Sequence, residues 1–207
     1  MSAQPQPATE AKPYVSEEEY LAVERQAERK HEYFQGEIVA MAGASFAHNL
    51  ITGNLITAFN NALRDRDCTA QASDLRLQVS EAGTYTYPDV SVVCGEPEFR
   101  PDAYLDTLLN PTLLVEVSSK STEDDDRRSK FMHYRRIPSL HYYLLVSSKV
   151  MEAVVYTRSE GEKWQLEVFA GPNAAIPLPR LNLELPLAEV YRKVPLTAAP
   201  PAAQPSN

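Results

Sequence analysis

The sequence predicts a mixed α/β (α+β) fold, in which a mixed central sheet is flanked by helices, with an added N-terminal helix and hairpin and a C-terminal hairpin. Two observations lead to this prediction. The chain has 207 residues, 43% hydrophobic and 23% charged, which is typical of one globular domain. Its middle part runs through helical and β-rich patterns in the order α, β, β, β, α, β.

The two ends of the chain are rich in Pro and Ala, which predicts disordered tails at 1–13 and 195–207 around a single domain at 14–194. No apolar run approaches the roughly 20 residues that cross a bilayer, and the first residues lack the pattern of a secretory signal. We therefore expect a cytoplasmic protein without membrane contact. The net charge of -8 argues against coating nucleic acid through bulk positive charge, but it permits a local basic cleft.

The first predicted elements precede the central sheet. Residues 16–30 begin with a Ser cap and have acids in the first turn and bases in the last, which predicts a helix. Residues 31–43 predict a hairpin that turns at Gln35-Gly36. Residues 45–65 repeat apolar side chains at helical spacing, so a second helix is expected there.

The central segments supply strands and one further helix. Residues 68–80 and 84–95 are β-rich and are separated by a Gly-containing turn, so they are predicted to pair as antiparallel strands. Residues 111–119 predict a short apolar strand. A helix is expected at 122–138, where a proline stops it, and a further strand at 140–148.

The last part of the domain carries no chemical signal. Residues 151–170 alternate around Gly161 and predict a hairpin that extends the sheet, with Trp164 as a packing residue. Residues 174–191 predict an ordered wrap with a short helix near Leu187.

Cysteine usage gives no sign of a metal or disulfide framework. Cys68 and Cys94 lack C-x-x-C spacing and have no pair of histidines beside them. We expect two buried thiols rather than a disulfide or a zinc site. No organic cofactor is expected either.

One carboxylate interrupts the apolar run "LLVEVSS". Alternation along a strand puts Leu114, Glu116 and Ser118 on one face, and the other face is apolar too, so both faces are expected to be buried. Removing an ion from water is costly unless partners compensate. Glu116 is therefore expected to have a cation, a metal ion or a hydrogen-bond network beside it; a structural Glu paired to one Arg is the alternative.

A second carboxylate, Asp89, follows Pro88 at the start of a β run. Either Asp89 merely starts its strand, a common role beside Pro, or this strand neighbours that of Glu116 and both side chains enter one site. Two adjacent carboxylates repel each other unless a divalent cation or a shared proton intervenes. Mg²⁺ prefers oxygen ligands and keeps several waters, so the pair is a candidate site for Mg²⁺ (or Mn²⁺).

The helix after Glu116 offers a cation. Helical periodicity places Arg127 and Lys130 on the apolar side of this helix, near Tyr134. A lysine on the buried side needs a partner, and the two carboxylates are the nearest candidates. A plain Lys–Glu ion pair is the alternative.

Two carboxylates, a metal ion and a lysine suit hydrolysis of a phosphodiester. The metal lowers the pKa of a bound water, and the lysine orients that water or stabilises the transition state. The same carboxylates without a metal suit glycoside hydrolysis. A lysine between them favours ionisation of both, which disfavours the general acid that a glycosidase needs.

At these residues the sequence resembles the Uma-type family of restriction endonucleases, a branch of the PD-(D/E)XK nuclease superfamily. The resemblance spans residues 14–191 and is close in "KHEYFQGEIVAMAGAS", "HNLITGNL", "SDLRLQV", "YTYPDVSVVCGEPEF", "NPTLLVEVSSKSTEDDDRRSKFMHYRRIPSLHYYLLV" and "LPLAEVY". The α, β, β, β, α, β order agrees with the superfamily core, so the resemblance implies a restriction-endonuclease-like fold.

The superfamily pattern is an Asp, then Glu-x-Lys on the next strand. Asp89 matches the first part, but "EVS" at 116–118 has Ser where the lysine is expected. This departure resembles the family's own form, in which the following helix supplies the lysine, at the position of Lys130. The resemblance implies that Asp89 and Glu116 are metal ligands, that the Val117 carbonyl completes the site, and that Lys130 assists the water or the leaving phosphate.

Five further residues are accessory candidates. His48, Asp74 and Glu32 lie in matching segments, and Arg127 and Tyr134 lie on the inner helix face. His48 stands where many relatives place an acidic residue. The alternatives are a capping or packing histidine, an aspartate that binds backbone at a strand start, and a surface glutamate.

Three hypotheses follow from the resemblance and the residues. The first is a Mg²⁺- or Mn²⁺-dependent DNA endonuclease, expected as a homodimer because cutting both strands needs two sites. The second is a non-catalytic nucleic-acid-binding or regulatory member of the same fold, which the missing in-strand lysine and the acidic composition favour. The third is a nuclease for an unusual nucleic acid, such as a branched or mobile-element intermediate. No segment indicates a recognition sequence.

Overall fold

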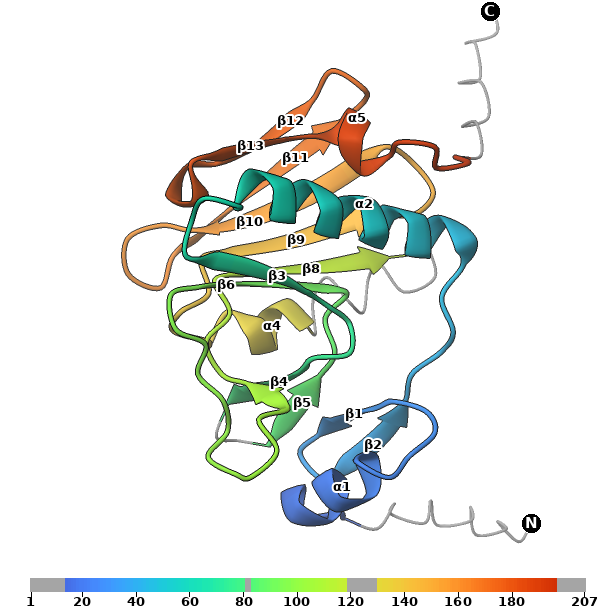
Figure 1. Ribbon diagram of the computed structural model, residues 1–207, viewed down its shortest axis with the longest axis vertical. Helices are drawn as coiled ribbons and strands as arrows, with labels where there is room; N and C mark the ends of the chain where they lie inside the picture. Colours follow the sequence, from blue (N-terminus) through green and yellow to red (C-terminus); the bar gives the residue numbers. More distant parts are fainter. Residues whose placement is uncertain (1–13, 81–82, 119–129, 197–207) are drawn as a thin grey trace, which may run out of the picture.

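Two β-sheets and the helices around them make up the computed structural model, which describes residues 14–80, 83–118 and 130–196 (Figure 1). The larger sheet has the strand order β11-β10-β9-β8-β6-β3. Its strands are β3 (Cys68–Ala72), β6 (Val90–Cys94), β8 (Leu113–Ser118), β9 (Tyr142–Ser147), β10 (Glu152–Arg158) and β11 (Trp164–Ala170). Strands β8 and β9 run parallel and the other neighbours antiparallel, so the sheet is mixed, as predicted.

The smaller sheet has the strand order β2-β1-β5-β4-β7. Its strands are β1 (His31–Phe34), β2 (Glu37–Ala40), β4 (Arg76–Ser80), β5 (Thr84–Thr86) and β7 (Thr107–Leu108). The predicted hairpin is confirmed in β1 and β2, where Gln35 and Gly36 both have positive φ, as a two-residue turn of this kind requires. Helix α1 (Glu17–Glu24) packs beside this sheet, and its Ser16 cap forms a complete capping box with Glu19.

Helix α1 is shorter than the predicted helix at 16–30. The basic residues expected in its last turn lie beyond it and bind neighbouring loops instead. Arg25 donates to Asp102 and Asp106, and the ammonium of Lys30 lies 2.8 Å from Asp74. These contacts take the place of the expected interaction with the helix end.

The segments 68–80 and 84–95 were each predicted as one strand, and this is wrong in detail. Each divides into two strands that belong to different sheets: β3 pairs with β6 in the larger sheet, whereas β4 pairs with β5 in the smaller one. A turn after β3 and the Pro88-Asp89 step after β5 make the two breaks. Proline lacks the N–H that a continuous ladder needs, so the chain crosses between sheets there.

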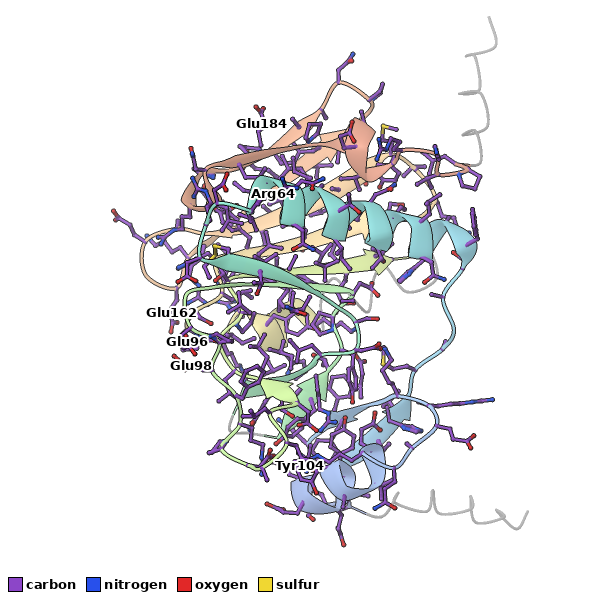
Figure 2. All side chains as sticks on the ribbon, in the orientation of Figure 1. Arg64, Glu96, Glu98, Tyr104, Glu162 and Glu184 are labelled. Atoms are coloured by element: carbon purple, nitrogen blue, oxygen red, sulfur yellow. A yellow bond between two sulfur atoms is a disulfide. The ribbon has the colours of Figure 1, made fainter. Side chains whose placement is uncertain are left out.

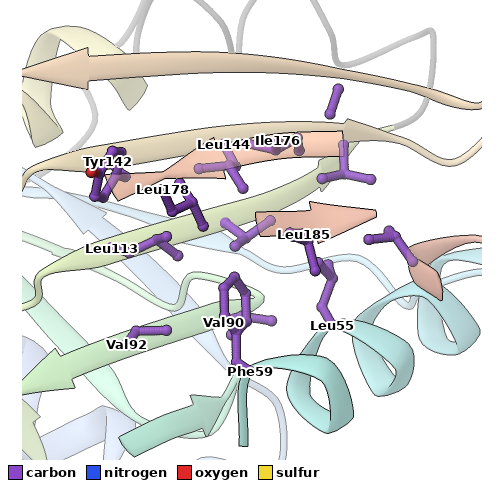
Figure 3. Close-up of a cluster of buried hydrophobic side chains, with 14 of the residues drawn as sticks. Leu55, Phe59, Val90, Val92, Leu113, Tyr142, Leu144, Ile176, Leu178 and Leu185 are labelled. Carbon is purple, nitrogen blue, oxygen red and sulfur yellow. The ribbon is translucent and has the colours of Figure 1, made fainter. Parts of the chain in front are cut away.

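One face of the larger sheet is covered by α2 (Phe46–Ala62), the hairpin of β12 (Ala175–Leu178) and β13 (Leu183–Pro186), and α5 (Leu187–Val190). The core on this face includes Leu55 and Phe59 of α2 and Val90, Leu113 and Leu144 of the sheet (Figure 3). The predicted helix at 45–65 and the wrap with a short helix near Leu187 are confirmed. Burying this stripe of α2 explains why its apolar residues recur at helical spacing.

The other face of the larger sheet packs against α4 (Phe131–Tyr134) and the smaller sheet, so that α4 lies between the two sheets (Figure 1). Tyr134 and Leu114 are fully buried in this second core. Phe131 stacks on Tyr156 and meets Trp164 edge-on, which confirms Trp164 as a packing residue. Residues 122–129 of the predicted helix at 122–138 lie outside the described residues, as do the predicted tail at 1–13 and residues 197–207 of the predicted tail at 195–207.

Cys68 and Cys94 form a disulfide, contrary to the expectation of two thiols (Figure 2). Antiparallel pairing of β3 with β6 places the two residues directly opposite each other, with 4.0 Å between their Cα atoms. Sequence spacing could not reveal this register. Among the described residues, no helix combines the length and apolarity that crossing a membrane requires.

Candidate active site

Strands β6 and β8 bring the two predicted carboxylates together. Their antiparallel register pairs Val90 with Val115, and continuing it by one residue sets Asp89 opposite Glu116. The backbone N–H of Val117 donates to Oδ2 of Asp89 over 2.7 Å. The expectation that Asp89 and Glu116 lie on neighbouring strands is therefore confirmed, with Asp89 just before β6 and Glu116 within β8.

Glu116 is buried, with 6% of its surface exposed, and its carboxylate has partners on α4. Oε1 of Glu116 lies 3.2 Å from the Lys130 ammonium and 2.8 Å from the Tyr134 hydroxyl. The Tyr134 hydroxyl also lies 3.1 Å from Oγ1 of Thr86 on β5. The Tyr134 hydroxyl therefore hydrogen-bonds to both Glu116 and Thr86, and it links α4 to β8 and β5.

Burial raises the pKa of Glu116 to about 8, because the loss of water around the carboxylate outweighs the attraction of Lys130. The charges of Asp89 and Glu32 raise this pKa further. Lys130 was expected to keep both carboxylates ionised, and for Glu116 its charge alone does not do so. A divalent cation would lower this pKa, since a cation favours the ionised form.

Asp89 is held from two sides. Besides Val117 N–H, Nε2 of His48 lies 3.1 Å from Oδ2 of Asp89. His48 belongs to the first turn of α2, where Ser45 caps the helix and accepts from the His48 backbone N–H. This contact brings a residue of α2 to the start of β6, so His48 lies at the candidate site.

Lys130 joins the two sheets at the site. It lies immediately before α4, and its side chain is only 13% exposed. Its ammonium lies 3.1 Å from Oε1 of Glu32 on β1, in addition to 3.2 Å from Glu116 on β8. The predicted inward position of Lys130 is thus observed, and Glu32 is a buried site residue rather than a surface one.

Two predicted accessory residues do not enter the described site. The side chain of Asp74 is 93% exposed and forms an ion pair with Lys30. Arg127 lies outside the described residues. Thr86, by contrast, was not predicted as a site residue, although it contacts Tyr134. Its only signal in the sequence is its position three residues before Asp89, and threonine is common in β-strands for other reasons.

The donor set fits a hard cation such as Mg²⁺. Within the described residues, the hydrogen bonds of the Asp89 carboxylate are made by Oδ2 and those of the Glu116 carboxylate by Oε1. One oxygen of each carboxylate therefore remains to bind a cation. No group of three His, Cys, Asp or Glu side chains suited to a metal occurs in the same part of the chain. Mg²⁺ commonly takes only one or two carboxylates and fills its other positions with water, so two carboxylates and a backbone carbonyl match its chemistry.

A family model described as "Putative restriction endonuclease", Uma2, matches residues 17–188. Two proteins of Synechocystis sp. (strain ATCC 27184 / PCC 6803 / Kazusa), both described as uncharacterized, are similar along most of their length. One is 39% identical over 180 residues, which cover 87% of this chain and 93% of the relative. The other is 39% identical over 158 residues, which cover 76% and 89%.

A crystal structure described as "a putative nuclease belonging to DUF820" from Anabaena variabilis ATCC 29413 has a similar fold. The TM-score is 0.68 at 20% sequence identity, and the match covers 86% of this chain and 97% of that one. At this identity the likeness speaks to the fold. It confirms the predicted mixed α+β fold.

Proposed function

Because this chain belongs to the Uma2 family, we propose that it is a Mg²⁺- or Mn²⁺-dependent nuclease that hydrolyses phosphodiester bonds, with DNA as its substrate. One observation carries the proposal: Asp89, Glu116 and Lys130, which come from three separate elements, meet at one buried site. Burying these charges is costly, so their convergence needs a reason beyond packing. Binding a cation and a phosphate supplies that reason.

Each side chain has a distinct part in the proposed reaction. Asp89 and Glu116 would hold the cation, with the Val117 carbonyl as a further oxygen donor. When bound, Mg²⁺ or Mn²⁺ would lower the pKa of a coordinated water and offset the charge of the phosphate. Lys130 would orient the attacking water or stabilise the leaving phosphate, because its ammonium is fixed at the same carboxylate.

The surrounding residues keep these groups in place. Tyr134 fixes Glu116 by donating to Oε1, and His48 fixes Asp89 through Oδ2. Glu32 on β1 holds the Lys130 ammonium from the smaller sheet. Positioning of this kind matters because hydrolysis of a phosphodiester depends on alignment and electrostatics.

We propose further that the protein acts as a homodimer in the cytoplasm. Two copies would bring two sites to the two strands of a DNA duplex. In a reducing cytoplasm Cys68 and Cys94 would be thiols, whereas the structure shows them as a disulfide.

The proposal is tested by cleavage assays on linear, supercoiled, branched and single-stranded DNA and on RNA, with Mg²⁺, Mn²⁺ or EDTA. We expect cleavage of at least one DNA substrate with a metal and none with EDTA. Asp89→Ala and Glu116→Ala should each abolish it. Cleavage unchanged by both substitutions would show that the site lies elsewhere.

Metal binding is tested separately by calorimetric titration of Mn²⁺. Glu116→Gln keeps the shape of the side chain but removes its charge, so it should bind Mn²⁺ far more weakly than the wild-type protein. Equal affinity would reduce Glu116 and Lys130 to a structural ion pair. DNA binding without cleavage on any substrate would favour the non-catalytic alternative.

A further inference from the structure

Strand β11 forms one edge of the larger sheet, and no described strand pairs with its outer side. Two hydrogen bonds fix which groups point outward: Ser159 N–H donates to Lys163 C=O, and Gly171 N–H donates to Met151 C=O, so both lie on the β10 side. Directions alternate along a strand, so the N–H and C=O groups of Trp164, Leu166, Val168 and Ala170 point away from the sheet. This edge is an open hydrogen-bonding surface.

The side chains of this edge divide into two faces. Leu166 and Val168 share a face with Trp164, and each of the two is 55% exposed, although both are large and apolar. Lys163, Gln165 and Glu167 are exposed on the opposite face. Protein edges usually carry charges or bulges that prevent pairing with another chain, and β11 pairs with β10 without a bulge along its whole length. Its apolar face is therefore suited to pairing.

We propose that β11 pairs with β11 of a second copy of this chain, antiparallel, about a twofold axis at Leu166. This register places Leu166 opposite Leu166 of the second copy and Trp164 opposite Val168, with their outward backbone groups in hydrogen-bonded pairs. On the other face, Gln165 of one copy lies opposite Glu167 of the second copy. Lys163 of the first copy lies diagonally from the same Glu167, within reach of an ion pair. Each of these contacts occurs twice by symmetry.

Side-chain matching selects this register over its two neighbours. A shift that centres the axis on Gln165 pairs Lys163 directly with Glu167. However, it sets the exposed apolar Val168 opposite Glu162. A shift that centres the axis on Glu167 keeps the same outward backbone groups in use, but it sets two glutamates directly against each other. Like charges opposite one another destabilise a strand pair. The register centred on Leu166 avoids both mismatches.

The inference rests on the proposed function only for its expectation of a homodimer. It requires neither metal nor DNA, because it concerns the edge opposite β3 and not the site residues. The tip of the β10–β11 hairpin, where Glu162 is labelled in Figure 2, would flank the interface at both ends. The two larger sheets would then join into one continuous sheet.

Sedimentation analysis of the full chain, without DNA or divalent metal, tests the dimer. The wild-type protein is expected to reach the mass of two chains. Leu166→Lys, which sets two lysines face to face, should give a monomer, while Val150→Lys, at a similarly exposed apolar position outside β11, should leave the dimer intact. Lys163→Glu and Glu167→Lys should each raise the dissociation constant about tenfold, and the double variant should restore it.

Cysteine cross-linking tests the register. Leu166→Cys should yield a covalent dimer when diamide oxidises the two facing thiols to a disulfide, because hydrogen-bonded partners lie within disulfide range. Val168→Cys should not, since its two copies would be about 13 Å apart along the strands. The wild-type protein, whose cysteines are already paired, is the blank.

Several results would overturn the inference. A monomer at every concentration, a dimer that survives Leu166→Lys, or cross-linking through Glu167→Cys but not Leu166→Cys would each do so. Circular dichroism and thermal unfolding of every variant separate loss of the interface from loss of the fold. A failed cleavage assay leaves these measurements unaffected, so the two proposals fail independently.

Discussion

The ammonium of Lys130 lies 3.2 Å from the Glu116 carboxylate, although the two residues belong to different elements. Lys130 precedes α4, and Glu116 is the fourth residue of β8. The position in β8 where the superfamily pattern has a lysine is Ser118 in this chain. The cation beside Glu116 is supplied instead by Lys130, next to α4. The predictions below start from this pair and extend to the residues around it.

Lys130→Ala should reduce the cleavage rate about 100-fold or more at saturating Mn²⁺, as loss of one fixed cation at a phosphate does. Binding of Mn²⁺ should persist, because the carboxylates remain. Single-turnover cleavage and calorimetry measure the two effects. Arg136→Ala removes an exposed cation just past the same helix and is the control; an equal loss in both variants would contradict a specific role for Lys130.

His48→Ala should weaken Mn²⁺ binding about 10- to 100-fold, because a group that orients a metal ligand commonly contributes this much. Asp89 would keep its bond from Val117 N–H and so would stay near the site. Asn49→Ala changes an exposed neighbour on α2 and should bind like the wild-type protein. Unchanged affinity in His48→Ala would assign that histidine to packing alone.

The Cys68–Cys94 bond should stabilise the oxidised protein. It closes a loop with a sequence separation of 26 residues, and disulfides of this kind contribute about 2–4 kcal/mol to the free energy of unfolding. Replacing both cysteines by serine should lower that free energy by this amount without reductant. Dithiothreitol should lower the wild-type value to that of the variant, whereas a variant equal to the oxidised protein would contradict the prediction.

Acid should weaken the fold around Arg25. Its guanidinium donates to Asp106 and holds the pKa of that carboxyl below its usual value. A depressed folded-state pKa stabilises the protein above the unfolded value, near 3.8, and this stabilisation is lost as the pH falls through the folded value. Denaturant unfolding of the wild-type protein should show this loss below about pH 4.

Arg25→Gln should cost about 1–2 kcal/mol at pH 7, and the difference from the wild-type protein should shrink as Asp106 is protonated. Lys30→Gln breaks the pair with Asp74, whose side chain is 93% exposed, and should change stability by less than about 1 kcal/mol. A pH-independent deficit in Arg25→Gln would show that Arg25 stabilises through packing instead.

The positions of Glu116 and Lys130 could be predicted from the sequence because they depend on local patterns. Glu116 could be identified because it is an isolated carboxylate in an apolar strand, and alternation along the strand predicted which face it occupies. Helical periodicity predicted that Lys130 lies on the buried side of its helix. The contact of Glu32 with Lys130 had no local signal, because it depends on how the β1 hairpin docks beside α4. The same holds for the disulfide, which depends on the register between β3 and β6.

The division of strands between two sheets also escaped prediction, although the turn residues Ser73 and Asp74 mark one break and Pro88 the other. In a β-rich stretch such residues fit a bulge or a loop as well as a change of sheet. Only long-range pairing decides between these outcomes. Arg127 and the first part of its predicted helix lie outside the described residues.

Lys130 contacts Glu116 from the larger sheet and Glu32 from the smaller one. The site is therefore complete only when both sheets have docked, and its assembly reports on tertiary structure. A folding intermediate that had formed the larger sheet alone would hold Asp89 beside Glu116 without the second anchor for the lysine. Under the proposed function, copies whose two sheets have not docked would lack the second anchor of Lys130 and would be poor nucleases.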